Sequence, residues 1–421
     1  MDVFVLNAII YAVTLIYIYR KRRKTDVYFW LWASYSIIAI MGPICENLRL
    51  HETNDVNLGY KVSFIPLVSS YFCTHIILWP FKYFEKWNFN NVNTNRFKII
   101  VYVSSIPFII ASFFLIVETI ATFQMGLGVA YELSHEGEML FEYGGFIDKI
   151  RGQSLTYARI FQPFMVIYSF SNIINYSNRK VSIVLLCLSF LPTLLSGIAW
   201  GSRGAMFFSV LNILFYFVVF QNYISIKLKR LLLKTGLIIG FLLIVVSVKI
   251  TNGRSEEGSI VETSAFDNIV RYFGETPLNS YYFYDKIENH PNGLRFFPEI
   301  TNEDRKYSSI REYVRYWSFR TGCNTALFKG LWLDCYIEFG FIGAWIYILL
   351  IVMFFYLLFF RHSNKLYSFP FIVFYYSNFA VYGLFSHGFS GRTSHLSFIY
   401  LIIITLVISY ITHKNTNESF L

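Results

Sequence analysis

About eleven stretches of this 421-residue chain are apolar over a length that can cross a lipid bilayer. A hydrocarbon core of about 30 Å takes roughly 20 residues of α-helix. The chain is 55% hydrophobic with a mean hydropathy of +0.47, which excludes a soluble domain built around one core. We expect membrane-spanning helices over residues 3–19, 27–44, 62–81, 99–118, 158–176, 181–200, 205–224, 231–250, 331–360, 369–385 and 396–411.

One connector between these stretches is far longer than the rest. The sequence therefore predicts an all-α polytopic membrane protein in three parts: helices 1–8 with short loops over residues 1–250, a large loop over 251–330, and helices 9–11 with a tail over 331–421. Glycine and proline divide the large loop, which predicts short amphipathic helices over 264–273, 277–287 and 308–317. We expect Pro277 in a first turn, with Thr276 as its cap.

Positive charge in short loops predicts the orientation, because lysine and arginine resist translocation. With the N-terminus outside, 18 basic residues lie on the cytoplasmic side and six on the other, leaving out the large loop. We therefore expect a multi-pass membrane protein with its N-terminus outside, its C-terminus in the cytoplasm and its large loop external.

The formal charge of +10 does not indicate nucleic-acid binding, because half of the 36 basic residues serve topology. The five cysteines show neither a CxxC pair nor a histidine partner, so we expect no metal site. Cys323 and Cys335 both fall on the expected external side, where a disulfide and two free thiols remain alternatives. The glycine-rich segment 119–157 is expected to be a loop, either a lid over a cleft or a solvated surface.

Charges beside the membrane are the first candidates for function, since an ionisable group within a span is costly. Arg203 stands between glycines at an external turn. Asp334 and Glu338 are four residues apart, so they share one helix face. The last external turn adds a further cluster, formed by His387, Arg392 and His395. All three groups fall on the same side, where loops distant in sequence are expected to meet.

The large loop combines arginines with aromatic residues. Guanidinium groups hold phosphates, and aromatic faces stack on sugar rings, so this pattern suits a lipid-linked phosphate that carries sugars. Each single arginine has the alternative of a solvated or paired surface charge. The arginines are Arg254, Arg271, Arg295, Arg305, Arg311, Arg315 and Arg320, and the aromatic residues are Tyr281, Tyr282, Tyr284 and Trp317.

At these residues the chain resembles the Wzy-type oligosaccharide repeat-unit polymerases, also called O-antigen polymerases. The likeness lies in the Gly-Ser-Arg-Gly-Ala run around Arg203, in the Glu-Phe-Gly-Phe-Ile-Gly run that begins at Glu338, and in the layout of many spans around one large loop. Some members carry an arginine followed by a glycine eleven positions on, and Arg311 and Gly322 have that spacing. Segment 119–157 has no second copy, so a mechanism with two matched loops is not expected.

The resemblance implies a metal-independent glycosyltransferase of lipopolysaccharide or related polysaccharide biosynthesis, with no cofactor. It also implies a bacterial inner (cytoplasmic) membrane, in which the N-terminus and the large loop are periplasmic and the C-terminus is cytoplasmic. The enzyme would transfer a growing glycan from an undecaprenyl diphosphate carrier onto a new lipid-linked repeat unit. Developing charge on the leaving diphosphate would be stabilised by arginines, and a base would take the proton of the acceptor hydroxyl. The expected base is His387, with Glu338 and His290 behind it. The expected substrate contacts are Arg203, Arg271, Arg392, Arg311, Arg254, Asp334 and Tyr281.

Several alternatives to this assignment remain open. Asp334 and Glu338 have the alternative of pairing with nearby arginines, and His387 that of an interfacial hydrogen bonder. For the whole protein, the alternatives are an O-antigen ligase and a transporter or flippase, although a loop of this size argues against transport. The expected partners are the lipid-linked oligosaccharide, membrane lipid and, by resemblance, a chain-length regulator. The sequence does not specify the sugars or their linkage.

Overall fold

The structure is a computed structural model that describes residues 2–50, 63–84, 94–126, 129, 141, 143–175, 179–236, 238, 240, 245–246, 265–301, 306–307, 310–389 and 392–413. Every regular element among these residues is helical, which confirms the predicted all-α class. Five described helices are long and apolar enough to cross a membrane, as a multi-pass membrane protein requires: Val3–Arg22, Val27–Asn47, Phe97–Met125, Arg179–Ala199 and Gly330–His362. The total of about eleven spans stays a prediction, and half of the span expected at 231–250 lies outside the described residues.

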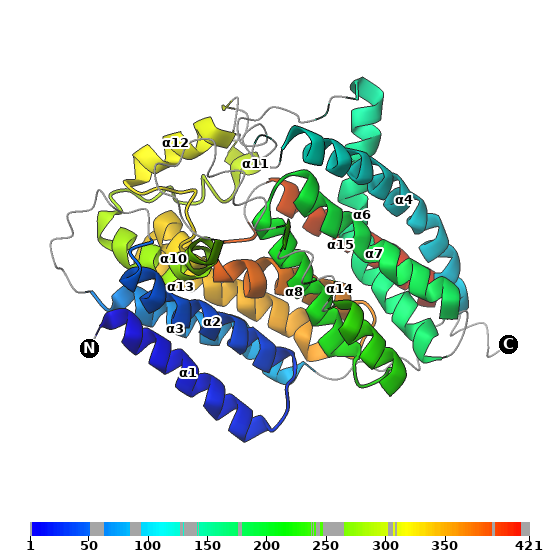
Figure 1. Ribbon diagram of the computed structural model, residues 1–421, viewed down its shortest axis with the longest axis horizontal. Helices are drawn as coiled ribbons and strands as arrows, with labels where there is room; N and C mark the ends of the chain where they lie inside the picture. The colour runs from blue at the N-terminus through cyan, green and yellow to red at the C-terminus, as the bar shows by residue number, and fades with distance from the viewer. Residues whose placement is uncertain are drawn as a thin grey trace. The chain divides into compact units, whose positions relative to one another are not determined.

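The chain divides into two compact units, and the first comprises Met1–Phe84, Val261–Arg361 and Phe374–His395. Within it α1 packs on α2, α10 packs on α2, and α3 packs on α13 (Figure 1). Its elements are α1 (Val3–Arg22), α2 (Val27–Asn47), α3 (Ile65–Leu78), η1 (Trp79–Tyr83), α10 (Ala265–Phe283), η3 (Tyr284–Lys286), α11 (Pro298–Thr301), α12 (Ile310–Thr321), α13 (Gly330–Leu358), the π-helix η6 (Tyr376–Val381) and η7 (Tyr382–Leu384).

The second unit comprises Glu85–Ile260, His362–Val373 and Leu396–Leu421. Its helices α4 (Thr94–Met125), α6 (Gly145–Ile174) and α7 (Arg179–Ala199) pack on one another, and α8 (Arg203–Phe220) packs on α7 (Figure 1). The boundary between the units falls within or beside η5 (Phe360–His362), α14 (Ser368–Tyr375) and α15 (Arg392–His413).

Local sequence explains where several helices begin. The side chain of Asp2 accepts a hydrogen bond from the Phe4 amide and caps α1. Asp26 caps α2 in the same way and also pairs with Arg22, the last residue of α1. Ser202 caps α8. Each cap satisfies an amide that the first helical turn leaves without an intrahelical partner.

The expected loop over 119–157 is partly helical. Helix α4 continues to Met125 and α6 begins at Gly145, whereas most of the residues between them lie outside the described part of the chain. Glu118 of α4 is fully buried and forms an ion pair with Arg151 of α6, whose Nη2 lies 3.0 Å from Oε2 of Glu118. Sequence reasoning placed Arg151 in a loop because glycines flank it. In the structure Arg151 is helical, and its ion pair joins α6 to α4.

The two helices expected at 264–273 and 277–287 are in fact one. Helix α10 runs without interruption through Gly274 and Pro277, so the predicted break and the cap at Thr276 are wrong. A β-carbon at Gly274 would lie 2.5 Å from Cβ of Cys45 and from the carbonyl oxygen of Met41, both on α2. The glycine serves close packing between two helices rather than a turn. The helix expected at 308–317 is confirmed as α12.

Candidate functional site

A break in the membrane-spanning helix α13 shapes the candidate site. Gly340 has φ 70° and ψ −177°, a conformation open almost only to glycine, so the helix is interrupted there. The carbonyl groups of Ile337 and Glu338 accept hydrogen bonds from a segment distant in sequence. Asn292 N lies 2.8 Å from the Glu338 oxygen, and His290 Nδ1 lies 3.0 Å from the Ile337 oxygen. The loop before α11 is thereby fastened to the broken helix.

Arg295 bridges the two carboxylates that the sequence places on one face of α13. Its Nε lies 3.0 Å from Oε2 of Glu338, and its Nη2 lies 2.8 Å from Oδ1 of Asp334. The amides of Gly293 and Arg295 donate to Oε1 of Glu338 at 2.8 and 3.1 Å. Both Glu338 oxygens are therefore occupied.

The charges of this cluster are buried together. The side chains of Arg295, Asp334 and Glu338 are 10%, 7% and 0% exposed. Burial acts against the positive charge of Arg295, but attraction from the two carboxylates outweighs it and raises the pKa of the guanidinium above its ordinary value. A buried charge without such partners would be strongly destabilising.

The Nη1 group of Arg295 is not used in the ion pairs of the cluster. Its Nε and Nη2 groups serve the two carboxylates and the Asp334 carbonyl oxygen. Among the residues that the structure describes, Nη1 has no hydrogen-bond partner. Arg295 therefore offers two further N–H donors from a rigidly held guanidinium.

His387 completes the cluster from the segment after η7. Its amide donates to Oδ2 of Asp334 at 2.9 Å, and its Nε2 lies 2.9 Å from the Tyr347 hydroxyl. The imidazole stacks on Phe296 with ring centroids 4.1 Å apart. Burial lowers the pKa of His387 to about 3, although Asp334 attracts the proton. The imidazole is therefore neutral at pH 7.

Lys329 anchors the turn that leads into α13. It is 1% exposed, and its ammonium group donates to the carbonyl groups of Asn324, Thr325 and Leu327. Burial lowers the pKa of Lys329. The amides of Lys329 and Gly330 both donate to the Phe385 carbonyl group at 2.8 Å, which holds the start of α13 beside the segment that carries His387.

The structure brings together four of the predicted site residues: Asp334, Glu338, His387 and His290. For the two carboxylates it selects the alternative of pairing with arginine. His387 is buried against Phe296, not exposed at an interface. Sequence reasoning counted Arg295 among seven arginines but did not select it, since its partners are about 40 residues away.

The remaining predicted residues lie elsewhere. Tyr281 is in α10, with its ring 5.2 Å from that of Phe4. Arg271 lies in α10, one turn before Glu275. The other predicted arginines occupy element ends or fall outside the description: Arg203 begins α8 in the second unit, Arg311 is in the first turn of α12, Arg392 begins α15, and Arg254 lies outside the described residues.

Neither Cys323 nor Cys335 forms a disulfide. All five cysteines are free thiols, and both of these are buried. The structure thus selects one of the two alternatives that the sequence left open. Cys335 lies beside Asp334 in α13 and Cys323 follows α12, so neither thiol is an expected reactant of the cluster.

The protein should become less stable as the pH is lowered, because His387 is neutral in the folded state. In the unfolded chain a histidine takes up a proton near pH 6.5, whereas the folded protein takes it up only near pH 3. Stability contributed by the neutral ring is full above pH 6.5 and is lost as the pH falls below it. At pH 5 we expect a loss of about 2 kcal/mol.

This pH effect is checked by thermal melts in detergent at pH 7.5 and pH 5, for the parent protein and for His387→Gln. Glutamine keeps a polar group near the Tyr347 hydroxyl but does not titrate. The variant should lose less stability than the parent over this interval. Equal losses in the two proteins would remove His387 as the cause.

The cluster has a defined chemical capacity. It presents a fixed guanidinium edge, a neutral imidazole able to accept a proton, and a tyrosine hydroxyl in contact with that imidazole. Such groups suit the binding of an anion and proton transfer from a hydroxyl. No protein-family model, curated protein or solved structure matches the chain.

Proposed function

We propose that the chain polymerises oligosaccharide repeat units carried on undecaprenyl diphosphate, by glycosyl transfer at the outer face of a bacterial inner membrane. The observation that carries the proposal is the Arg295 cluster, in which a loop residue is fixed by two carboxylates of a broken membrane helix. A lipid-linked diphosphate has its charge at the membrane surface, and a preorganised guanidinium there stabilises charge on it.

In the proposed reaction the hydroxyl oxygen of the acceptor sugar bonds to the anomeric carbon of the growing chain. The bond from that carbon to the diphosphate oxygen breaks, and its electron pair leaves with undecaprenyl diphosphate. Arg295 contacts the diphosphate through Nη1, and the buried His387 receives the hydroxyl proton through Tyr347. This step requires the negative charge of the bound diphosphate to raise the low pKa of His387. Glu338 is then a positioning residue, because its oxygens hold Arg295 and two loop amides.

Arg271 and Arg392 belong to the same unit as the cluster and remain proposed contacts of the diphosphate or the glycan. Tyr281 remains a proposed contact of the glycan, and His290 remains an alternative candidate for the base. Arg203 belongs to the second unit and is proposed separately as a phosphate-binding residue. Each of these roles rests on the sequence pattern and is tested by its own alanine variant.

Transport of a lipid-linked unit is the second candidate, because interrupted membrane helices form the binding sites of many transporters. Here the carbonyl groups next to the break already accept hydrogen bonds from Asn292 and His290. They are not offered to a passing ion or substrate. Because these carbonyl groups are already hydrogen-bonded within the protein, they favour a catalytic site of fixed geometry over a transport site that changes its conformation.

The proposal is tested by deleting the gene in its host and displaying the surface glycan on a gel. A polymerase deletion should reduce the ladder of glycans to a single repeat unit on its lipid anchor, because ligation and flipping continue. Complementation with the parent sequence should restore the ladder. Loss of even the single unit would indicate a ligase or a flippase, and an unchanged ladder would exclude all three functions.

A further inference from the structure

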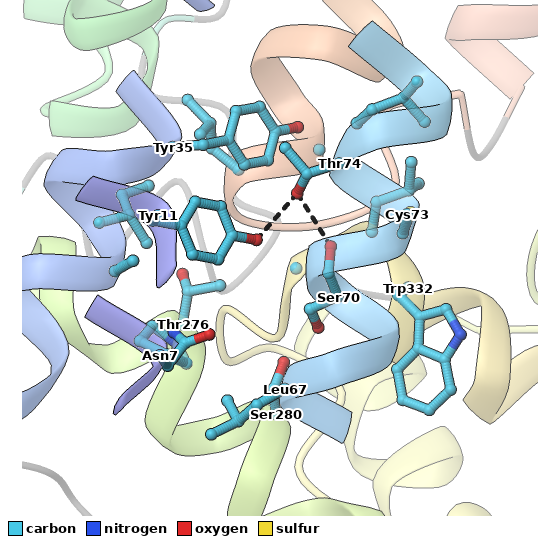
Figure 2. A pocket seen from close by; sticks show the side chains of 18 residues that line it. Asn7, Tyr11, Tyr35, Leu67, Ser70, Cys73, Thr74, Thr276, Ser280 and Trp332 are labelled. Carbon is cyan, nitrogen blue, oxygen red and sulfur yellow. Dashed lines mark hydrogen bonds between the residues drawn. The ribbon is translucent and has the colours of Figure 1, made fainter. Parts of the chain in front are cut away.

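Five helices and the η7 segment of the first unit meet around a small cavity whose wall carries several hydroxyl groups (Figure 2). Its wall includes Tyr11 of α1, Tyr35 of α2, Thr74 of α3 and Thr276 of α10. The volume is about 50 Å³. One water molecule needs about 10 to 15 Å³, so the space holds about three to five.

Two glycines leave this space open. A β-carbon at Gly383 would lie 2.9 Å from the Tyr35 hydroxyl, and one at Gly330 would lie 3.3 Å from Cγ2 of Thr276. Gly330 also has φ 73°, which other residues rarely adopt. The cavity therefore exists because these two positions lack side chains.

The hydroxyl groups around the cavity are not all satisfied by the protein. Tyr11 and Thr74 share a hydrogen bond of 3.0 Å, and Thr74 also donates to the Ser70 carbonyl group (Figure 2). By contrast, the hydroxyls of Tyr35 and Thr276 have no partner among the described residues, although these residues are only 8% and 6% exposed. A buried polar group without a partner is costly, and a bilayer offers no bulk water to satisfy it.

We propose that this cavity binds a cluster of about three to five water molecules that hydrogen-bonds the hydroxyls of Tyr35 and Thr276. The wall of the cavity is mostly apolar, so these two unpartnered hydroxyls are what holds the water. The volume is large enough for water, whereas a sugar or a lipid headgroup would not fit. Tyr35 and Thr276 come from different helices, so the cluster bridges α2 and α10. This inference does not depend on the proposed glycosyl transfer.

The water site is close in sequence to the Arg295 cluster along two segments, the start of α13 and the segment from η7 to His387. Gly330 precedes Asp334 by four residues and Gly383 precedes His387 by four, and Asp334 and His387 are hydrogen-bonded to each other. Ser280, also on the cavity wall, donates to the Lys329 carbonyl group. The bound water thus lies where α10 meets the first turn of α13, and Asp334 follows that turn in the same helix.

The test is radiolytic footprinting of the whole protein in nanodiscs, with ¹⁸O-labelled water as the probe. Radicals formed from bound water oxidise adjacent side chains, so Cys73 and Tyr35, which line the cavity, should take up ¹⁸O several-fold faster than equally buried residues that do not. Cys335 and Tyr282 are the matched controls: they are 0% and 7% exposed, close to the 2% of Cys73 and the 8% of Tyr35, and neither lines the cavity. Equal rates in the two pairs would show a dry cavity and overturn the proposal.

Two variants test whether the labelling depends on the cavity and on its hydroxyl groups. Gly383→Ala places a methyl group against the Tyr35 hydroxyl and should lower the labelling of Cys73 toward that of Cys335. Thr276→Val removes one partner of the water at nearly constant volume and should lower it as well, which covers the case in which Gly383→Ala does not fold. Unchanged labelling of Cys73 in a folded variant of either kind would contradict a cluster held by these hydroxyls.

Discussion

Replacing Arg295 by alanine is expected to destabilise the protein by about 3–5 kcal/mol, because Asp334 and Glu338 would remain buried without a counter-ion. It should also abolish polymer in the complemented host. The two carboxylate side chains are 7% and 0% exposed, so water cannot take the place of the guanidinium. Thermal melts in detergent measure the first effect, and the glycan ladder measures the second.

The structural and chemical parts of this effect are separable. In the triple variant Arg295→Met, Asp334→Asn, Glu338→Gln the unpaired charges are gone, so most of the lost stability should return. Polymer should still be absent, because no guanidinium edge faces the diphosphate. Arg315→Ala removes an exposed arginine of α12 and should change neither property. A triple variant that polymerises would reduce Arg295 to a structural role.

Much of the fold follows from the apolar pattern of the sequence, because a long apolar stretch has few alternatives to a helix. The pattern placed α1, α2, α7 and α13 to within a few residues. It failed at α10, where glycine and proline suggested a break. Gly274 instead allows close contact with α2, and only the neighbouring helix reveals that role.

The candidate site was predicted in part for the same reason. A spacing of four residues puts Asp334 and Glu338 on one face of a helix, which is a local property of the sequence. The choice of Arg295 among seven arginines depends on a contact across about 40 residues, for which the sequence carries no local signal. The sequence marked Gly340 only as part of a motif, because a glycine within an apolar run does not by itself predict a break in the helix.

Replacing Gly340 by alanine should separate the loop from α13. At φ 70° and ψ −177° alanine is strained by about 1–3 kcal/mol, and the strain is relieved if the helix continues through this residue. A continuous helix would use the Ile337 and Glu338 carbonyl groups for its own hydrogen bonds. The bonds from His290 and Asn292 would then be lost, and Arg295 would no longer be aligned with Asp334.

Hydrogen exchange of the peptide around Asn292 and Gly293 measures this separation directly, and we expect it to become faster together with a loss of polymer. Gly152→Ala is the matched control, because that glycine lies within α6 and a β-carbon there meets nothing within 4 Å. The control should leave exchange unchanged and stabilise its helix by up to about 1 kcal/mol. If Gly340→Ala exchanged as slowly as the parent, the loop would be held by contacts other than the two carbonyl groups at the break. The Arg295 ion pairs would then be sufficient to fix the site.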